Sequence, residues 1–203
     1  NGRLTFHLKE LVGAGLAGAA AADALARRGW QVTVLDAATQ AASGASALPV
    51  GLLVPHVSRD DSPRSQLSRA GMRLTLHAVQ RLLVEGLDYG ERGVLELAVD
   101  HQRRLPGYWT AQGRHWSDDV LTPDIAAQLH RAGAAQDKAI WHQRGCWVKP
   151  ARLVQALLAQ PGIRFQGNSL VQQIGFANGA WQLRGPGGEL LAQAPQLVLA
   201  NAG

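Results

Sequence analysis

The sequence predicts an α/β protein: a Rossmann-like parallel sheet with a β-meander, interrupted by an inserted antiparallel α+β domain. Three observations lead to this prediction. A glycine turn at residues 13–18 joins an apolar strand to an alanine-rich helix, further strands and helices flank residues 86–148, and turn-forming residues separate three short strands near the C-terminal end. The 203 residues, 46% of them hydrophobic, are enough for one domain with an insert.

The glycine turn is the strongest local signal. Gly13 permits a tight backbone turn, Gly15 leaves room for a pyrophosphate beside the main chain, and Gly18 lets the helix pack close to the strand. A helix that begins here would present unpaired N–H groups and a partial positive charge to phosphates. Such turns also occur for packing alone, so the pattern by itself leaves both interpretations open.

The residues after the turn favour a dinucleotide. We expect a helix from Leu16 to Arg28, followed by a buried strand at Gln31–Leu35 that is rich in β-branched residues. Asp36 ends this strand, 23 positions after Gly13, where a ribose hydroxyl needs an acceptor. Its charge argues against NADP, whose 2′-phosphate it would repel. The alternative for Asp36 is a solvated turn residue.

The strand that leads into the glycine turn and the loop that follows Asp36 are both unusual. Lys9 and Glu10 interrupt the apolar run expected of a central parallel strand. Residues 37–51 form a loop of small residues instead of a second crossover helix. Such a loop can lie along an extended dinucleotide, with Ser46 offering a hydroxyl and Gly51 allowing close approach to a ring system. The alternative is a surface loop.

The rest of the chain predicts the other elements and the domain organisation. Ser62 is expected to cap a helix that starts at Pro63 and ends near Leu83. Further expected strands are 52–57, 93–99, 139–142, 162–165, 170–174, 180–183, 189–191 and 196–200, and further helices are 123–131 and 150–160. These elements predict a discontinuous nucleotide-binding domain over 8–85 and 149–203, a cap domain over 86–148, and a C-terminal remainder missing from this chain.

Composition limits the other possibilities. The single cysteine, Cys146, excludes an internal disulfide and a thiolate cluster, and we interpret it as a packing residue in a cytoplasmic protein without a metal site. No stretch approaches the ~18 apolar residues of a membrane span. The net charge of +5 would suit a polyanionic partner but is also common in chains that bind no nucleic acid.

Several spaced motifs together resemble the D-amino-acid oxidase and glycine oxidase superfamily of FAD enzymes. These are the glycine turn, the acid at the second strand, the Ala-Ser loop, the inserted cap and the final Leu-Ala-x-x-Gly. Within the superfamily, the chain resembles most the FAD-dependent half of bifunctional enzymes that make 5-methylaminomethyl-2-thiouridine at the tRNA wobble position. The segments that carry this second resemblance are Arg28–Thr33, Gly44–Ser46 with Gly51 and Pro55, Gly93–Ala98 and Gly145–Pro150.

The resemblance implies a flavoprotein oxidoreductase that oxidises a carbon–nitrogen bond with FAD. The implied substrate is a modified wobble uridine in tRNA, whose carboxymethylaminomethyl group loses its carboxymethyl part, and a fused or partner methyltransferase would act next. Two alternatives remain: a glycine or D-amino-acid oxidase acting on a free amino acid, and a dinucleotide-binding fragment without catalysis.

The resemblance also implies site residues. FAD would contact Gly13, Gly15, Leu16, Ala17, Gly18, Asp36, Ala37, Ala45, Ser46, Gly51, Leu52, Leu53, Val171 and Ala200. Substrate-binding residues of this superfamily usually come from the part after Gly203, so no catalytic residue is assigned. His56 is the one candidate for proton transfer, with a structural role as the alternative.

Overall fold

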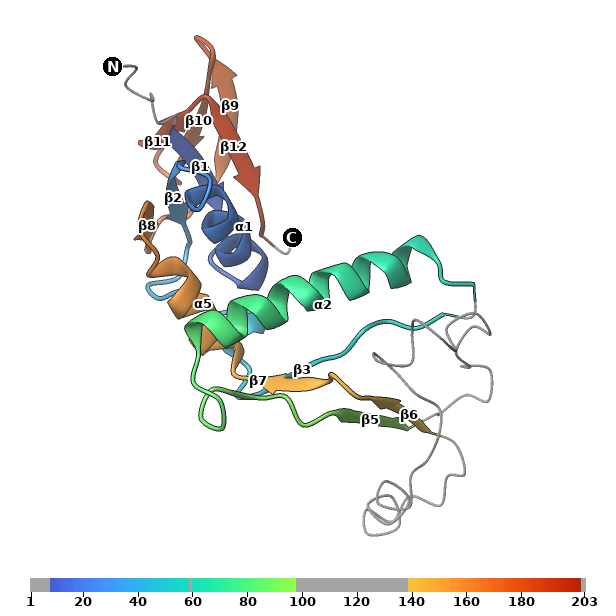
Figure 1. The fold of residues 1–203 in the computed structure, drawn as a ribbon. Coiled ribbons are helices and arrows are strands. Elements are labelled where there is room, and N and C mark those ends of the chain that lie inside the picture. Colours follow the sequence, from blue (N-terminus) through green and yellow to red (C-terminus); the bar gives the residue numbers. More distant parts are fainter. Residues whose placement is uncertain (1–7, 59, 98–138, 202–203) are drawn as a thin grey trace, which may run out of the picture. The chain divides into compact units, whose positions relative to one another are not determined.

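The computed structural model describes residues 8–58, 60–97 and 139–201 (Figure 1). Contacts divide the chain into two units, one comprising residues 1–49 and 149–203 and the other residues 50–148. Among the described residues, no helix is long and apolar enough to cross a membrane.

The first unit contains the predicted parallel sheet. Its strands run in the order β12-β1-β2-β8, and every neighbouring pair is parallel. Their bounds are β1 Leu8–Val12, β2 Gln31–Leu35, β8 Ile163–Gln166 and β12 Gln196–Leu199. The fold class predicted from the sequence is confirmed, and β2 has the predicted bounds.

Two helices of the same unit pack on this sheet and on each other: α1 (Leu16–Ala26) and α5 (Pro150–Leu158). The shared core consists of small and branched side chains that are fully or almost fully buried: Leu11, Ala19, Ala22, Val32, Val34, Leu153, Val154 and Leu157. The helix α1 ends before the predicted Arg28 because Gly29 turns the chain with a φ of +86°.

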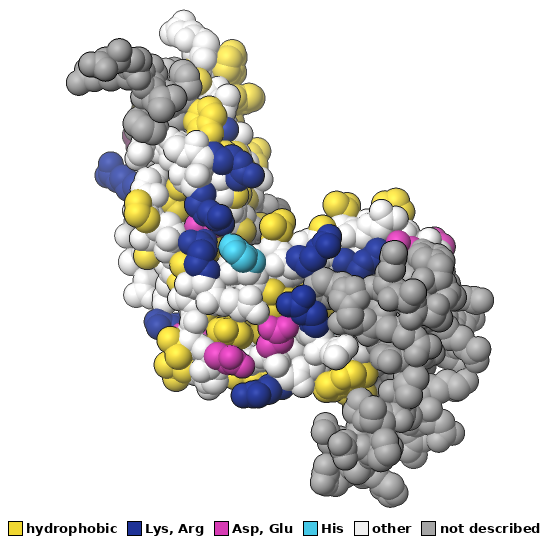
Figure 2. Space-filling view, in the orientation of Figure 1, with side chains coloured by type: hydrophobic (Ala, Val, Ile, Leu, Met, Phe, Trp, Pro, Cys, Tyr) yellow, Lys and Arg dark blue, Asp and Glu magenta, His cyan; other side chains and the backbone are white. Residues whose placement is uncertain are grey.

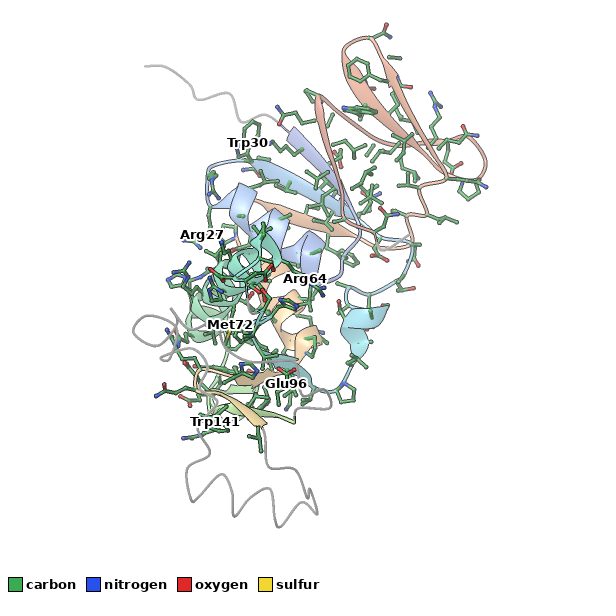
Figure 3. All side chains as sticks on the ribbon, turned by 90° about the vertical axis from the view of Figure 1, so that its right-hand side faces the viewer. Arg27, Trp30, Arg64, Met72, Glu96 and Trp141 are labelled. Atoms are coloured by element: carbon green, nitrogen blue, oxygen red, sulfur yellow. The ribbon has the colours of Figure 1, made fainter. Side chains whose placement is uncertain are left out.

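A three-stranded antiparallel meander, in the order β11-β10-β9, contacts β1 and β12. Figure 3 shows it on the side of the parallel strands opposite α1. Its bounds are β9 Gln173–Ala177, β10 Ala180–Arg184 and β11 Leu190–Ala194. The predicted start of the first strand, at Leu170, is wrong: Gln173 is the first residue to pair, opposite Arg184.

The two charged residues of β1 do not interrupt the strand, since the ladder uses main-chain groups only. Lys9 places its ammonium group 3.8 Å from the centre of the Trp30 ring. Glu10 is 3% exposed, and its Oε2 has no hydrogen-bond partner among the described residues. Burial raises the pKa of Glu10 to about 7, although the charge of Arg164 opposes the rise.

The second unit contains the long helix α2 (Pro63–Leu82) and two small antiparallel sheets. Ser62 caps α2 as predicted, because its side chain accepts a hydrogen bond from the Ser65 N–H at 3.4 Å. The strands are β3 Gly51–Leu53, β7 Cys146–Val148 and β4 Tyr89–Gly90 in one sheet, and β5 Val94–Leu97 with β6 Ala139–His142 in the other. The predicted helix at 123–131 lies outside the described residues.

The pairing of β3 with β7 joins the segment after the small-residue loop to the end of the insert. Residues 50–85 therefore belong to the same contact unit as 86–148, whereas the sequence grouped them with the nucleotide-binding segments. The domain boundaries at residues 85 and 149 stay a prediction.

Candidate dinucleotide-binding site

The glycine turn is held between two neighbouring strands. The N–H of Gly13 donates to the Leu35 carbonyl at 2.8 Å, and the N–H of Ala200 donates to the Val12 carbonyl at 2.8 Å. Gly13 has a φ of +107°, and a Cβ there would lie 2.8 Å from the carbonyl carbon and oxygen of Ala200. Both the backbone conformation and the space therefore require glycine.

The helix after the turn begins in very tight packing. A Cβ on Gly18 would lie 1.8 Å from the carbonyl oxygen of Gly13 and 2.9 Å from Leu11 Cδ2. No L side chain fits this position without moving the main chain of the turn. Gly13 and Gly18 thus fix the start of α1 directly on the end of β1.

The N-terminus of α1 is only partly capped. Gly15, at the N-cap position, supplies no side-chain hydrogen bond, and Ser46 Oγ instead accepts from the Leu16 N–H at 3.0 Å. The first bond within the helix is from Ala19 to Gly15. The amides of Ala17 and Gly18 therefore have no acceptor within the helix, and they can bind an anion.

Ser46 comes from a short 3-10 turn, η1 (Ala45–Ala47), in the loop after β2. Its side chain is 8% exposed, and its Oγ would lie 3.2 Å from a Cβ on Gly15. This contact spans 30 residues of sequence. The small-residue loop is thus anchored on the glycine turn at Ser46, while residues 43–45 and 47–50 on either side are exposed.

Asp36 binds main-chain groups with both carboxylate oxygens. Its Oδ2 accepts from the Ala14 N–H at 2.7 Å, and its Oδ1 accepts from the Ala38 N–H at 2.9 Å. Its carbonyl accepts from the Ser169 N–H at 2.8 Å. A carboxylate has about four lone pairs, so each oxygen can accept one more hydrogen bond, for example from a ribose hydroxyl. Asp36 therefore positions the glycine turn whether or not a nucleotide is bound.

The loop after β8 crosses the loop after β2. Asn168 donates its N–H to the Ala38 carbonyl at 3.1 Å, and Thr39 Oγ1 donates to Asn168 Oδ1 at 2.8 Å. A Cβ on Gly167 would lie 2.5 Å from the Thr39 carbonyl oxygen. This crossing brings the segment leading to Val171 beside Asp36. Our sequence analysis missed the crossing. The Gly167–Asn168 pair that follows β8 is a turn signal that could have indicated it.

Comparison with known proteins identifies the family. Residues 11–203 match the family described as "DAO: FAD dependent oxidoreductase". The chain belongs to this family. Two similar relatives are each named "tRNA 5-methylaminomethyl-2-thiouridine biosynthesis bifunctional protein MnmC". The protein from Polaromonas naphthalenivorans is 48% identical over 194 residues, and the one from Delftia acidovorans is 51% identical over 203 residues.

The match covers unequal shares of the two chains. It includes 94% of this chain but only 30% and 31% of those two relatives, so the chain spans about a third of their length. Among solved structures, glycine oxidase from Geobacillus kaustophilus has a TM-score of 0.67 at 23% identity, covering 96% of this chain and 55% of that chain. Iminodiacetate oxidase from Chelativorans sp. BNC1 has a TM-score of 0.70 at 24% identity, covering 95% and 54%. These two structures show the same fold.

The cofactor of the DAO family is FAD, and the residues of the first unit fit its ADP part. The amides of Ala17 and Gly18 at the α1 N-terminus have no acceptor within the helix, and Asp36 has acceptor capacity left. Gly13 and seven other expected FAD contacts lie in the same unit, the seven being Gly15, Leu16, Ala37, Ala45, Ser46, Val171 and Ala200. Their contacts with FAD stay a prediction.

The remaining predicted site residues belong to the second unit. Gly51, Leu52 and Leu53 form β3, which pairs with β7. His56 lies just beyond β3, with its Nδ1 3.0 Å from Ser65 Oγ and its main-chain N–H donating to Ser68 Oγ at 2.7 Å. The contact with Ser65 satisfies the imidazole at Nδ1, and a role in proton transfer stays a prediction.

The described residues include neither a reactive cysteine thiolate nor a group of metal-ligating side chains. Cys146 is fully buried, and burial raises the pKa of its thiol to about 11, so the reactive thiolate is disfavoured. Within residues 8–58, 60–97 and 139–201, no three His, Cys, Asp or Glu side chains are grouped to hold a metal ion.

Proposed function

We propose that this chain is the FAD-binding part of an enzyme that removes the carboxymethyl group from carboxymethylaminomethyl-uridine or its 2-thio form at the tRNA wobble position. The observation that carries the proposal is the 48–51% identity to MnmC proteins over 94% of the chain. The start of α1 supports it, because the Ala17 and Gly18 amides have no acceptor within the helix and can bind a pyrophosphate.

The reaction needs a two-electron acceptor, which FAD would supply when bound: the carboxymethyl carbon next to the nitrogen loses a hydride to it, and the nitrogen loses a proton. The resulting imine of the substrate takes up water and splits into the free aminomethyl-uridine and glyoxylate. The protein's own contribution is binding and orientation. The Ala17 and Gly18 amides would hold the pyrophosphate, and Asp36 would accept from the adenosine ribose while it fixes the turn.

The two relatives are about three times as long as this chain, and their names indicate a second activity. The relatives are named as bifunctional, and this chain spans about a third of each. We propose that the intact protein carries a methyltransferase that methylates the free amine, and that it works in the cytoplasm, where tRNA is modified.

The proposal is tested by mixing the FAD-loaded intact protein, of which this chain is a part, with tRNA that carries carboxymethylaminomethyl-uridine. Nucleosides from the digested tRNA are then analysed by mass spectrometry. We expect conversion to the aminomethyl nucleoside, with glyoxylate as the second product. Glycine, sarcosine and D-amino acids serve as parallel substrates. Turnover of a free amino acid without turnover of the tRNA would overturn the proposal in favour of an amino-acid oxidase.

A further inference from the structure

Helix α2 carries an unusual distribution of charge. Its 20 residues, Pro63–Leu82, include four arginines and one histidine but no aspartate or glutamate. Four of these five side chains follow one another at intervals of four residues: Arg69, Arg73, His77 and Arg81. Because residues four apart are neighbours on a helix surface, these four form one row, which we call the basic row.

The basic row lies apart from the side by which α2 is anchored. The buried residues of the helix are Ser65, Met72, Leu76 and Val79. In Figure 3, which views α2 nearly along its axis, Met72 lies toward the strands of the same unit. Arg73, His77 and Arg81 are exposed. Figure 2 shows dark blue Lys or Arg side chains and one cyan histidine along the segment that α2 occupies in Figure 1.

The outer members of the row contribute to the fold, since Arg81 lies in the last turn of α2, where a positive charge is favourable, but the described residues explain no such role for Arg73 and His77. Arg69 forms an ion pair with Asp61, but no ion pair or hydrogen bond joins Arg73 or His77 to another side chain in the described part of the chain. Arg69 and Arg73 are like charges at a spacing of four residues, and such a pair destabilises a helix by roughly 0.2–0.5 kcal/mol. Folding alone therefore gives no reason for the exposed positions of Arg73 and His77 in this row, whereas binding to an anion would.

The length of the basic row indicates which kind of anion it could bind. Successive members rise by about 6 Å along the axis, so the four side chains extend over about 18 Å. A single phosphate would be held by groups that converge on one point. An extended row instead matches a chain of regularly spaced negative charges, and arginine is the side chain most suited to phosphate oxygens.

We propose that the basic row of α2 contacts the phosphate backbone of the tRNA substrate. This inference rests on the proposed function, which makes a tRNA the partner, and adds the surface that holds it. Contacts of this kind position the RNA without reading its sequence, and they release counterions, so binding weakens steeply with salt.

The experiment measures binding of a fluorescently labelled tRNA transcript to the full 203-residue chain by anisotropy, at several salt concentrations. The test variant is Arg73→Gln/Arg81→Gln. The matched control, Arg152→Gln/Arg184→Gln, removes two positive charges from α5 and β10. We expect the test variant to bind about tenfold or more weakly, and the slope of log K against log salt to become shallower by about 1.5. The control should change affinity less than about twofold.

Melting curves of both variants show whether the fold is intact. Equal binding and equal slopes for the test variant and the wild-type chain would overturn this inference, while conversion of the modified tRNA would leave the proposed function standing. A second probe, phosphatidylserine vesicles, distinguishes another polyanionic surface: binding to vesicles but not to tRNA would also overturn it. Loss of tRNA binding in Leu67→Ser/Leu74→Ser, but not in the arginine variant, would mean that the two exposed leucines of α2 form the contact instead.

Discussion

The glycine turn and the basic row of α2 differ in whether their charged side chains have hydrogen-bond partners within the chain. At the turn, the one negative side chain, Asp36, is bound through both oxygens to main-chain N–H groups. On α2, three arginines and a histidine stand in a row with no acidic residue in the helix, and three of the four side chains are exposed. The first arrangement stabilises the fold, and the second costs a little stability. We therefore expect substitutions at the turn to lower the free energy of unfolding, and substitutions in the row to change binding only.

The largest effect is expected from Gly18→Ala. The new Cβ would lie 1.8 Å from the Gly13 carbonyl oxygen, so the turn or the helix must move. We expect a loss of at least ~3 kcal/mol in the free energy of unfolding, together with loss of FAD binding. Circular dichroism melts and flavin absorbance measure both. Gly175→Ala is the control, because nothing lies within 4 Å of its new Cβ. Equal melts for the two variants would contradict the packing of α1 on the turn.

The next effect comes from Glu10, in the strand that leads into the turn. Its pKa is raised from 4.5 to about 7 by burial, so the folded state keeps a proton that the unfolded state loses. The free energy of unfolding should therefore fall as pH rises from 4.5 to 7, by about 3 kcal/mol in total. Glu10→Gln should flatten this profile and be more stable than the wild-type chain at pH 8.

Urea titrations between pH 4.5 and 8 measure the profile of Glu10→Gln. The exposed Glu189 provides the control, and Glu189→Gln should keep the wild-type pH dependence. A wild-type profile in Glu10→Gln would show that other groups cause the pH dependence.

Asp36→Asn tests the carboxylate itself. The amide has one acceptor oxygen, so its NH₂ group must face either the Ala14 or the Ala38 N–H, which has then lost its partner. We expect a loss of about 2 kcal/mol in the free energy of unfolding at pH 7, measured by urea titration. An unchanged value would mean that the two main-chain bonds do not hold the turn.

Ser46→Ala removes the hydroxyl that accepts from the Leu16 N–H. The loss should resemble that of an N-cap, about 1 kcal/mol, and the same melts can detect it. Ser43→Ala is the matched control from the same loop, since Ser43 is exposed and bonds only locally, to the Gln40 carbonyl. A smaller loss for Ser46→Ala than for Ser43→Ala would contradict the anchoring of this loop on α1.

The smallest effect on stability is expected from Arg73→Gln. Removing one of several like charges in the basic row should leave the melting temperature unchanged or raise the free energy of unfolding by ~0.3 kcal/mol. Differential scanning calorimetry at low salt measures this. A clear loss of stability would show that Arg73 serves the fold, and the contrast between the two regions would then fail.

Local sequence patterns predicted elements of both units. The β-branched run Gln31–Leu35 forms β2 as expected, and the cap at Ser62 starts α2 where the serine-proline pair indicated. The start of β9 was wrong because all five of its residues are exposed, so no alternation of buried and exposed side chains marks the strand. The short strand β7 gave no periodic signal, since it has only three residues.

The site was predictable in its parts but not in its connections. The spacing of Gly13, Gly18 and Asp36 indicated a nucleotide-binding turn, because a tight turn, close helix packing and a ribose acceptor each require one of these residue types. The bond from Ala14 to Asp36 and the cap from Ser46 join residues 22 and 30 positions apart, and such contacts depend on how the loops pack. The burial of Glu10 could not be predicted for the same reason, since the meander that contacts β1 lies far along the sequence.

The central claim, that the glycine turn of this chain binds FAD, is tested most directly by the visible absorption spectrum of the purified chain, with FAD added if it is colourless. We predict the bands of bound oxidised flavin, with FAD released on denaturation and no flavin retained by Gly13→Val, whose side chain would meet Ala200. A chain that melts cooperatively, and so is folded, but takes up no FAD at saturating concentration would contradict the claim.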